Sequence, residues 1–172
     1  LRYEQADEFL QLCYQFWEGS WQNDAVKIDK QARIFTDPAK VKAIHHQGRF
    51  YQSDGVFQVM PSIQRTPVLF QAGASAKGLA FATQHAEAIF IGGGEKSAIK
   101  RQVETIRQLA KAQGRNPNDI KVLMGITVVT DKRHDLAQAK LAEYEGYASS
   151  EAGLAHYSSS VGIDLSQYAN ED

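Results

Sequence analysis

The sequence has a single cysteine, almost no excess charge and no long apolar run. Because Cys13 is the only cysteine among 172 residues, an internal disulfide and a cysteine-rich zinc site are excluded. The 19 basic and 20 acidic residues nearly cancel, which gives no electrostatic footprint for nucleic acid or for an anionic membrane surface. No apolar run approaches the roughly 20 residues of a membrane-spanning helix. We therefore expect no nucleic-acid, membrane or metal partner, and a cytoplasmic location.

The composition that is present is that of an ordinary globular protein. Hydrophobic residues make up 43% and charged residues 23% of the chain, and the length is typical of one domain. We predict a single domain over residues 1–172. The chain begins with Leu1 rather than Met, and it begins inside a helical pattern, so we expect it to be a piece of a longer protein.

The first third of the chain combines a helix with an irregular insertion. Apolar residues recur at spacings of three and four over residues 3–18, which predicts an amphipathic helix. Residues 20–66 carry proline and glycine breakers and show no helical period. We interpret them as an insertion of the kind that shapes a binding site.

A small hairpin is predicted inside this insertion. Residues 49–52 and 56–59 alternate apolar and polar side chains, as strands with one buried face do. Asp54-Gly55 between them is a favoured two-residue hairpin turn, so we expect the chain to reverse there.

Residues 67–149 alternate strand and helix three times. We predict strands at 67–72, at 88–91 and within 120–130, each followed by a helix, at 76–86, 97–113 and 131–148. The first strand is nearly continuous in apolar residues, so we expect both of its faces to be buried. This alternation predicts a parallel sheet with right-handed crossovers. Residues 150–172 form a tail with one short helix at 151–157.

A loop of small residues joins the first of these strands to its helix. It reads Gln71-Ala72-Gly73-Ala74-Ser75-Ala76-Lys77-Gly78. Small residues let a ligand approach the backbone, and the free N–H groups of a helix N-terminus attract phosphate. Ser75 would add a hydroxyl hydrogen bond. The alternative is that Ser75 only caps its helix.

Three better-known ligand or nucleophile motifs are absent. Lys77 occupies a glycine position of the serine nucleophile elbow, and Glu95 interrupts the order that the phosphate loop of NTPases requires. Ser97 stands where the dinucleotide fingerprint needs glycine. We interpret the triple glycine at 92–94 as a strand-to-helix turn, at the strand end where open sheets and barrels bind ligands.

The histidine pair His45-His46 does not indicate a metal site. Adjacent residues of a strand point to opposite faces, so the two imidazoles cannot easily bind one ion. A pocket-facing role for one of them and a surface position both stay open. The spacing of the remaining residues predicts no catalytic triad and no carboxylate pair.

Several segments resemble one family of enzymes. They are residues 3–21, 35–41, 46–50, 67–90 and 162–168. The most specific part is the Gln-Ala-Gly-Ala-Ser run at 71–75, followed by Gly78, Ala82, His85, Ala86 and Glu87. These segments are similar to the flavin-dependent monooxygenase group of the bacterial luciferase-like superfamily. That group includes nitrilotriacetate monooxygenase component A, dibenzothiophene-sulfone monooxygenase and long-chain alkane monooxygenase.

The resemblance implies a fold and a chemistry. The fold would be an α/β TIM (β/α)8 barrel with insertions, of which this chain carries roughly the fifth to seventh strand–helix units. The enzyme would take reduced FMN from a separate NAD(P)H-dependent flavin reductase. It would insert one oxygen atom of O2 into a small organic substrate through a flavin hydroperoxide. Members of this superfamily are often homodimers or homotetramers.

The resemblance also implies site residues. The cofactor-binding set would be Gln71, Ala72, Gly73, Ala74, Ser75 and Ala76. In that set Ala74 and Ser75 would bind the phosphate, and Gln71 would face the flavin ring or the ribityl chain. His46 and Phe50 are candidates for the substrate side. The catalytic residues of the family match no position here, so they stay unassigned.

Two alternatives to this reaction remain at this stage. A related enzyme would use reduced flavin or a deazaflavin for hydride transfer rather than oxygen transfer. A truncated, non-catalytic half-barrel would instead bind a partner or pair with itself, because exposed strand edges tend to associate.

Overall fold

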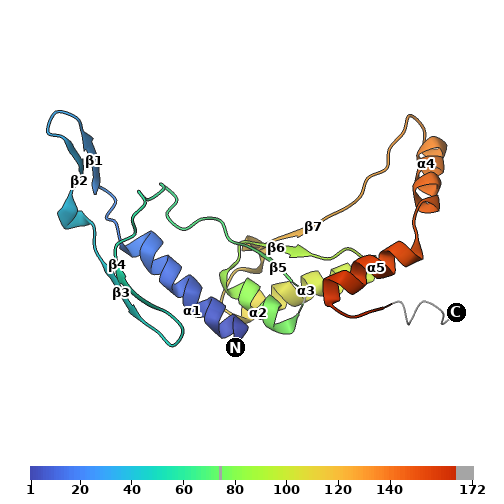
Figure 1. Ribbon diagram of the computed structural model, residues 1–172, viewed down its shortest axis with the longest axis horizontal. Helices are drawn as coiled ribbons and strands as arrows, with labels where there is room; N and C mark the ends of the chain where they lie inside the picture. The colour runs from blue at the N-terminus through green and yellow to red at the C-terminus, as the bar shows by residue number, and fades with distance from the viewer. Residues whose placement is uncertain (74, 166–172) are drawn as a thin grey trace. The chain divides into compact units, whose positions relative to one another are not determined.

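The computed structural model describes residues 1–73 and 75–165 of the chain (Figure 1). By its internal packing the chain divides into two units, Leu1–Gly125 and Ile126–Asp172. The residues that the sequence predicts for cofactor and substrate belong to the first unit.

Helix α1 (Arg2–Tyr14) begins the first unit and continues into a π-helical turn, η1 (Gln15–Gly19). This confirms the helix predicted over residues 3–18. The apolar stripe predicted for this helix includes Phe9 but not Leu12, yet Leu12 is buried and Phe9 is half exposed. The apolar pattern therefore locates the helix but does not by itself say how deeply each residue is buried.

Two antiparallel hairpins follow α1. Their strands are β1 (Val26–Asp29) with β2 (Ile34–Thr36), and β3 (Ile44–Gln47) with β4 (Gln52–Gly55). A short 3-10 turn, η2 (Pro38–Lys40), lies between them, and the Asp37 side chain caps it by accepting the Ala39 N–H. The region is irregular, as the breakers predict, but it is richer in strand than expected.

The predicted position of the hairpin turn is wrong. The chain reverses at residues 48–51, not at Asp54-Gly55, which lie in β4. The reason is a contact with α1, because the Glu8 carboxylate accepts the N–H groups of Phe50 and Tyr51 and holds the turn there. Gly48 fits beside it, since a Cβ at that position would collide with the Glu8 carboxylate and displace it from these bonds. Alternation of side chains along a strand carries no information about such a contact.

A three-stranded parallel sheet forms the rest of the first unit. Its strands are β5 (Phe70–Ala72), β6 (Ala88–Ile91) and β7 (Lys121–Met124), paired in that order. Helix α2 (Ala76–His85) connects β5 to β6, and α3 (Lys96–Ala112) with the turn η3 (Pro117–Asp119) connects β6 to β7. The predicted alternation of strand and helix is confirmed.

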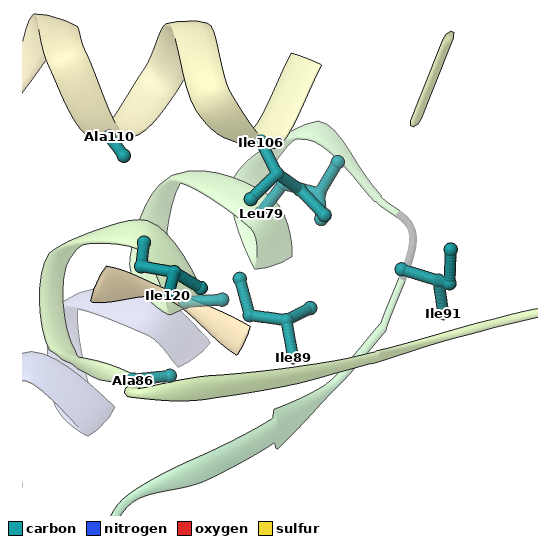
Figure 2. Packing of buried hydrophobic residues seen from close by; sticks show 8 residues of the cluster. Leu79, Ala86, Ile89, Ile91, Ile106, Ala110 and Ile120 are labelled. Atoms are coloured by element: carbon teal, nitrogen blue, oxygen red, sulfur yellow. The ribbon is translucent and has the colours of Figure 1, made fainter. Parts of the chain in front are cut away.

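The hydrophobic core lies between this sheet and the two helices (Figure 2). The buried cluster consists of Leu79, Ala82, Ala86, Ile89, Ile91, Ile106, Ala110 and Ile120. Leu79 and Ile106, from the two helices, face Ile89 of the sheet (Figure 2). Each fully buried isoleucine contributes roughly 1.5–3 kcal/mol to folding. The 3.6-residue period of α3 predicts Ile106 and Ala110 on this face, and both are there.

The other face of the sheet is exposed, which corrects the expectation for the first strand. Phe70 is 56% exposed and Phe90 is 46% exposed, and their rings stack on each other with centroids 5.9 Å apart. In the strand register Phe70 lies opposite Ala88, and Phe90 lies opposite Leu123. The continuous apolar run is therefore real, but α2 and α3 cover only one of its faces.

The second unit contains two helices, α4 (His134–Gly146) and α5 (Ser150–Val161). α4 confirms the helix predicted at 131–148, whereas α5 extends well beyond the predicted 151–157. The Ser149 side chain caps α5 at its start, and Gly162 ends it with a left-handed φ of 70°. None of the helices in the described part of the chain combines the length and apolarity needed to cross a membrane.

Candidate functional site

The carboxyl ends of the three parallel strands meet at one edge of the sheet. β5, β6 and β7 end at Ala72, Ile91 and Met124, and each is followed at once by glycine. The glycines of this edge are Gly73, Gly92, Gly93, Gly94 and Gly125. A Cβ added at any of them would meet no described atom within 4 Å. The edge is therefore open, and its backbone is accessible to a ligand.

The loop after β5 ends in a capped helix N-terminus. The Ser75 Oγ accepts the N–H of Gly78 at 3.1 Å, so Ser75 does cap α2. The first backbone bond of the helix runs from the Leu79 N–H to the Ser75 carbonyl at 2.8 Å. The N–H groups of Ala76 and Lys77 thus point out of the helix end, where the helix dipole is positive. Capping leaves the hydroxyl proton of Ser75 available to a ligand.

A tyrosine from α1 adds a second hydroxyl to this helix end. A Cβ at Gly78 would lie 2.7 Å from the Tyr3 Oη and 2.9 Å from the Ser75 Oγ. The two hydroxyl groups therefore converge over Gly78. Sequence reasoning did not find Tyr3, which lies far from the loop in the chain. The sequence signal for a close contact at this point of α2 was Gly78, a glycine inside a helical pattern.

The predicted cofactor residues of β5 lie on opposite faces of the sheet. Gln71 pairs in register with Ile89, so it shares the sheet face that carries the core, and its amide donates to the Ala72 carbonyl at 3.0 Å. Ala72 pairs with Phe90 and shares the exposed face. A contact of Gln71 with the flavin stays a prediction. Ala74 lies outside the described residues.

His46 and Phe50 lie together, and both contact Glu8 of α1. The His46 Nε2 is 3.3 Å from the Glu8 Oε1, and the Phe50 N–H donates to the same carboxylate at 3.0 Å. The guanidinium of Arg49 covers the Phe50 ring, 4.9 Å from its centroid. Sequence reasoning did not single out Glu8. These contacts anchor the β3–β4 hairpin, and a role on the substrate side stays a prediction.

The Glu8 carboxylate is held in its ionised form. Burial opposes ionisation, but the N–H groups of Tyr51 and Phe50 and the imidazole of His46 outweigh it and lower the pKa of Glu8. The side chain is 13% exposed, so these bonds lie largely out of water.

The described residues do not build a metal site. Within 1–73 and 75–165, no three His, Cys, Asp or Glu side chains are grouped closely enough to hold an ion. Hydroxyl groups and the positive end of a helix favour an anion chemically, and binding of a phosphate at this edge stays a prediction.

Comparison with known proteins decides the family. The family model described as luciferase-like monooxygenase matches residues 1–171. The chain belongs to the luciferase-like monooxygenase family. The resemblance seen in the sequence is thereby confirmed.

Two curated members of the luciferase-like monooxygenase family illustrate the relationship. The chain is 47% identical over 171 residues to the long-chain alkane monooxygenase of Geobacillus thermodenitrificans, covering 99% of this chain and 39% of that protein. It is 45% identical over 166 residues to the dimethyl-sulfide monooxygenase of Hyphomicrobium sulfonivorans, covering 96% of this chain and 35% of that protein. The chain thus spans less than half the length of these relatives.

Solved structures of the family give the same result. A crystal structure of long-chain alkane monooxygenase superposes with a TM-score of 0.89, over 99% of this chain and 39% of that one. A riboflavin lyase crystallised with modified FMN and its substrate riboflavin superposes with a TM-score of 0.87 at 40% identity, over 99% of this chain and 37% of that one. The predicted fold class is confirmed: the chain carries part of the luciferase-like TIM barrel. The described strands form no closed sheet.

Proposed function

We propose that this chain is part of a reduced-FMN-dependent monooxygenase and that the loop at 71–76 holds the FMN phosphate. One observation carries the proposal. In a member of the luciferase-like family, the hydroxyl groups of Tyr3 and Ser75 converge at an open helix N-terminus on the carboxyl edge of the sheet.

The residues present fit a phosphate group. A phosphate needs several N–H or O–H donors and a backbone that it can approach closely. The hydroxyl protons of Tyr3 and Ser75 and the N–H groups of Ala76 and Lys77 supply the donors. Gly73, with φ of 141° and open space at its Cβ position, supplies the approach. In this proposal Ala72, Ala74 and Ala76 keep the rest of the loop small.

The proposed reaction divides between the cofactor and the protein. Reduced FMN, when bound, supplies the activation of O2. The residues of this chain bind the phosphate and so orient the cofactor, while the insertion with His46 and Phe50 borders the substrate. One oxygen atom enters a small organic substrate and the other leaves as water.

The proposal includes partners. A separate NAD(P)H-dependent flavin reductase would supply the reduced flavin, and the enzyme would be a cytoplasmic homodimer or homotetramer. The similarity to a relative named nitrilotriacetate monooxygenase component A, whose name states one component of a larger system, supports the reductase. The names of the two relatives, which state an alkane and dimethyl sulfide, support a small organic substrate.

The test uses the full-length protein that contains this chain. It is mixed with a flavin reductase, NADH, FMN and 18O2, and each of a long-chain alkane and dimethyl sulfide is tried as substrate. We expect O2 uptake above that of the reductase alone, and one 18O atom in the product. A product formed without 18O would contradict oxygen transfer and favour the hydride-transfer alternative.

A second candidate is cleavage of riboflavin, favoured by the similarity to the riboflavin lyase structure. The same assay with riboflavin as the substrate, followed by chromatography of the flavin, separates the two. Loss of riboflavin that depends on the enzyme and on O2 would support the lyase. Unchanged riboflavin beside an oxygenated organic product would support the monooxygenase.

A further inference from the structure

A buried histidine joins helices α1 and α2 away from the phosphate loop. His85 is the last residue of α2, and its side chain is only 8% exposed. Its Nε2 lies 2.6 Å from the Asp7 Oδ1, and its Nδ1 lies 3.0 Å from the Tyr14 Oη. Both partners belong to α1, so one imidazole contacts the neighbouring helix at two positions, Asp7 and Tyr14.

In this cluster each hydrogen-bond donor has an acceptor in one arrangement of protons. Burial raises the pKa of Tyr14, so its phenol keeps its proton and is able to donate to the Nδ1 of His85. The Nε2–H then donates to Asp7, which also accepts from the side chains of Gln84 at 3.0 Å and Gln11 at 2.7 Å. Such a satisfied, partly buried network has one preferred geometry.

Aromatic contacts extend this geometry toward the start of both helices. The Phe81 ring, one turn before His85, has its centroid 4.8 Å from the imidazole and 5.5 Å from the Tyr3 ring. The centroid of the Tyr14 ring lies 5.9 Å from that of the imidazole. Tyr3 therefore meets the first turns of α2 while Tyr14 meets its last residue, so the two helices run in the same direction along this contact.

The far end of this contact is the proposed phosphate site. The Tyr3 and Ser75 hydroxyl groups both lie against Gly78, where a Cβ would stand 2.7 Å from the first oxygen and 2.9 Å from the second, so both positions depend on the missing side chain. Rings slide and tilt easily against one another, whereas hydrogen bonds are directional. The bonds at His85 therefore define the position of α1 along α2 more narrowly than the ring contacts do.

We propose that Asp7, His85 and Tyr14 are positioning residues, which hold α1 in register on α2 so that the Tyr3 hydroxyl stays beside that of Ser75. None of the three touches the ligand. The inference rests on the proposed function for the identity of that ligand, an FMN phosphate. It deepens that function by assigning the cluster that keeps the site assembled.

The test compares two flavins in the full-length protein. FMN and riboflavin differ only in the phosphate, so their affinity ratio reports the phosphate site. We expect His85→Gln and the milder Tyr14→Phe to weaken FMN binding by roughly five- to tenfold, the coupling expected of one network. Riboflavin binding should be unchanged. Gln113→Ala is the matched control, because the hydrogen bonds that it removes run from the C-cap of α3 to Ala80 and Thr83 of α2.

A double-mutant cycle with Tyr3→Phe completes the test. If His85 acts through Tyr3, His85→Gln causes no further loss of FMN affinity once the Tyr3 hydroxyl is gone. Additive losses, or equal losses for FMN and riboflavin, would overturn the positioning role.

The two proposals fail in different ways. If the wild-type protein does not prefer FMN over riboflavin, the phosphate site is wrong and the positioning role falls with it. If the wild type prefers FMN and Tyr3→Phe lowers that preference while His85→Gln and Tyr14→Phe do not, only the positioning role is overturned.

Discussion

At the scale of single residues, the proposed site depends on groups that converge from distant parts of the chain. Tyr3 comes from the first helix, and Ser75 and Gly78 come from the first turn of α2. Gly78 serves the contact by having no side chain, since a Cβ there would lie 2.7 Å from the Tyr3 Oη. The Ser75 oxygen caps the helix, and in the proposed function its hydroxyl proton also donates to the phosphate.

Removing the Ser75 hydroxyl should weaken FMN binding. Ser75→Ala deletes one charge-assisted hydrogen bond, worth about 1.5–3 kcal/mol, and also a helix cap worth about 1 kcal/mol of stability. Titration calorimetry of the full-length protein measures the first effect and thermal unfolding the second. Ser149→Ala is the control, because it removes the cap of α5 by the same chemistry. It should lower stability and leave FMN affinity unchanged; equal FMN affinity in all three proteins would refute the role of Ser75.

Filling the space at Gly78 should separate binding from stability. Gly78→Ala gains about 0.5–1 kcal/mol of helix propensity but loses part of the Ser75 cap, so the net change in unfolding free energy is small. The new methyl group displaces the Tyr3 hydroxyl, so FMN affinity should fall while riboflavin affinity does not. Unfolding in urea and flavin titration give the two readouts. A fall in stability with unchanged FMN affinity would show that the two hydroxyl groups do not act together.

At the scale of elements, the β3–β4 hairpin is attached to α1 through one carboxylate. Glu8 accepts two backbone N–H groups of the turn and contacts His46. The attachment is continued by the ion pair of Glu4 with Arg49 and by the tilted contact of the Phe9 and Tyr51 rings, 5.7 Å apart. The hairpin thus packs along α1 through several contacts, and its position depends on that helix.

The stability contributed by Glu8 should depend on pH in a defined direction. The pKa of Glu8 is lowered in the folded chain, so its contribution is complete above the ordinary glutamate value of about 4.3 and is lost as the pH falls through the lowered value. Glu8→Gln should therefore lower the Tm at pH 7, and the gap to the wild type should close in acid. Thermal unfolding across this range is the measurement. Glu4→Gln, at an exposed ion pair, should change the Tm little at any pH; a gap for Glu8→Gln that stays constant with pH would contradict the assignment.

The elements differ in how far the sequence predicts them. The strand–helix units follow from local signals, and the core positions Ile106 and Ala110 follow from the helical period of α3. The small residues at 71–76 predict the connection between β5 and α2, which the structure has there. The position of the β3–β4 turn cannot be predicted from local sequence, because Glu8, 42 residues away from Phe50, fixes it. Tyr3 is missed for the same reason, since no periodicity within α1 reveals which part of another helix its ring will meet.

At the scale of the whole molecule, the bare face of the sheet is the dominant feature. Phe70 and Phe90 are about half exposed on this face, and Leu123 lies in the same row as Phe90. In a closed barrel the face opposite the helices is the interior, filled by side chains from the other strands. The chain spans 39% of the length of the alkane monooxygenase.

Residues 1–172 expressed alone should therefore self-associate. A contiguous apolar face with two free strand edges favours aggregation. Light scattering during size-exclusion chromatography should show species larger than a monomer, and Phe90→Glu should reduce them. In the full-length protein the same substitution should instead destabilise the fold, because it buries a charge in the barrel interior. A monodisperse 19.1 kDa monomer of the wild-type segment would contradict this account.

The open carboxyl edge also has a practical meaning for protein engineering. Gly73 and Gly94 have left-handed backbones, but Gly92, Gly93 and Gly125 do not, and all have empty space where a Cβ would stand. Gly92, Gly93 and Gly125 can therefore accept ordinary side chains without backbone strain. A library limited to these positions would vary the size and polarity of the rim while leaving the hydroxyl groups of the loop untouched. Under the proposed function, such a library would test how side chains at this edge affect which substrates are accepted.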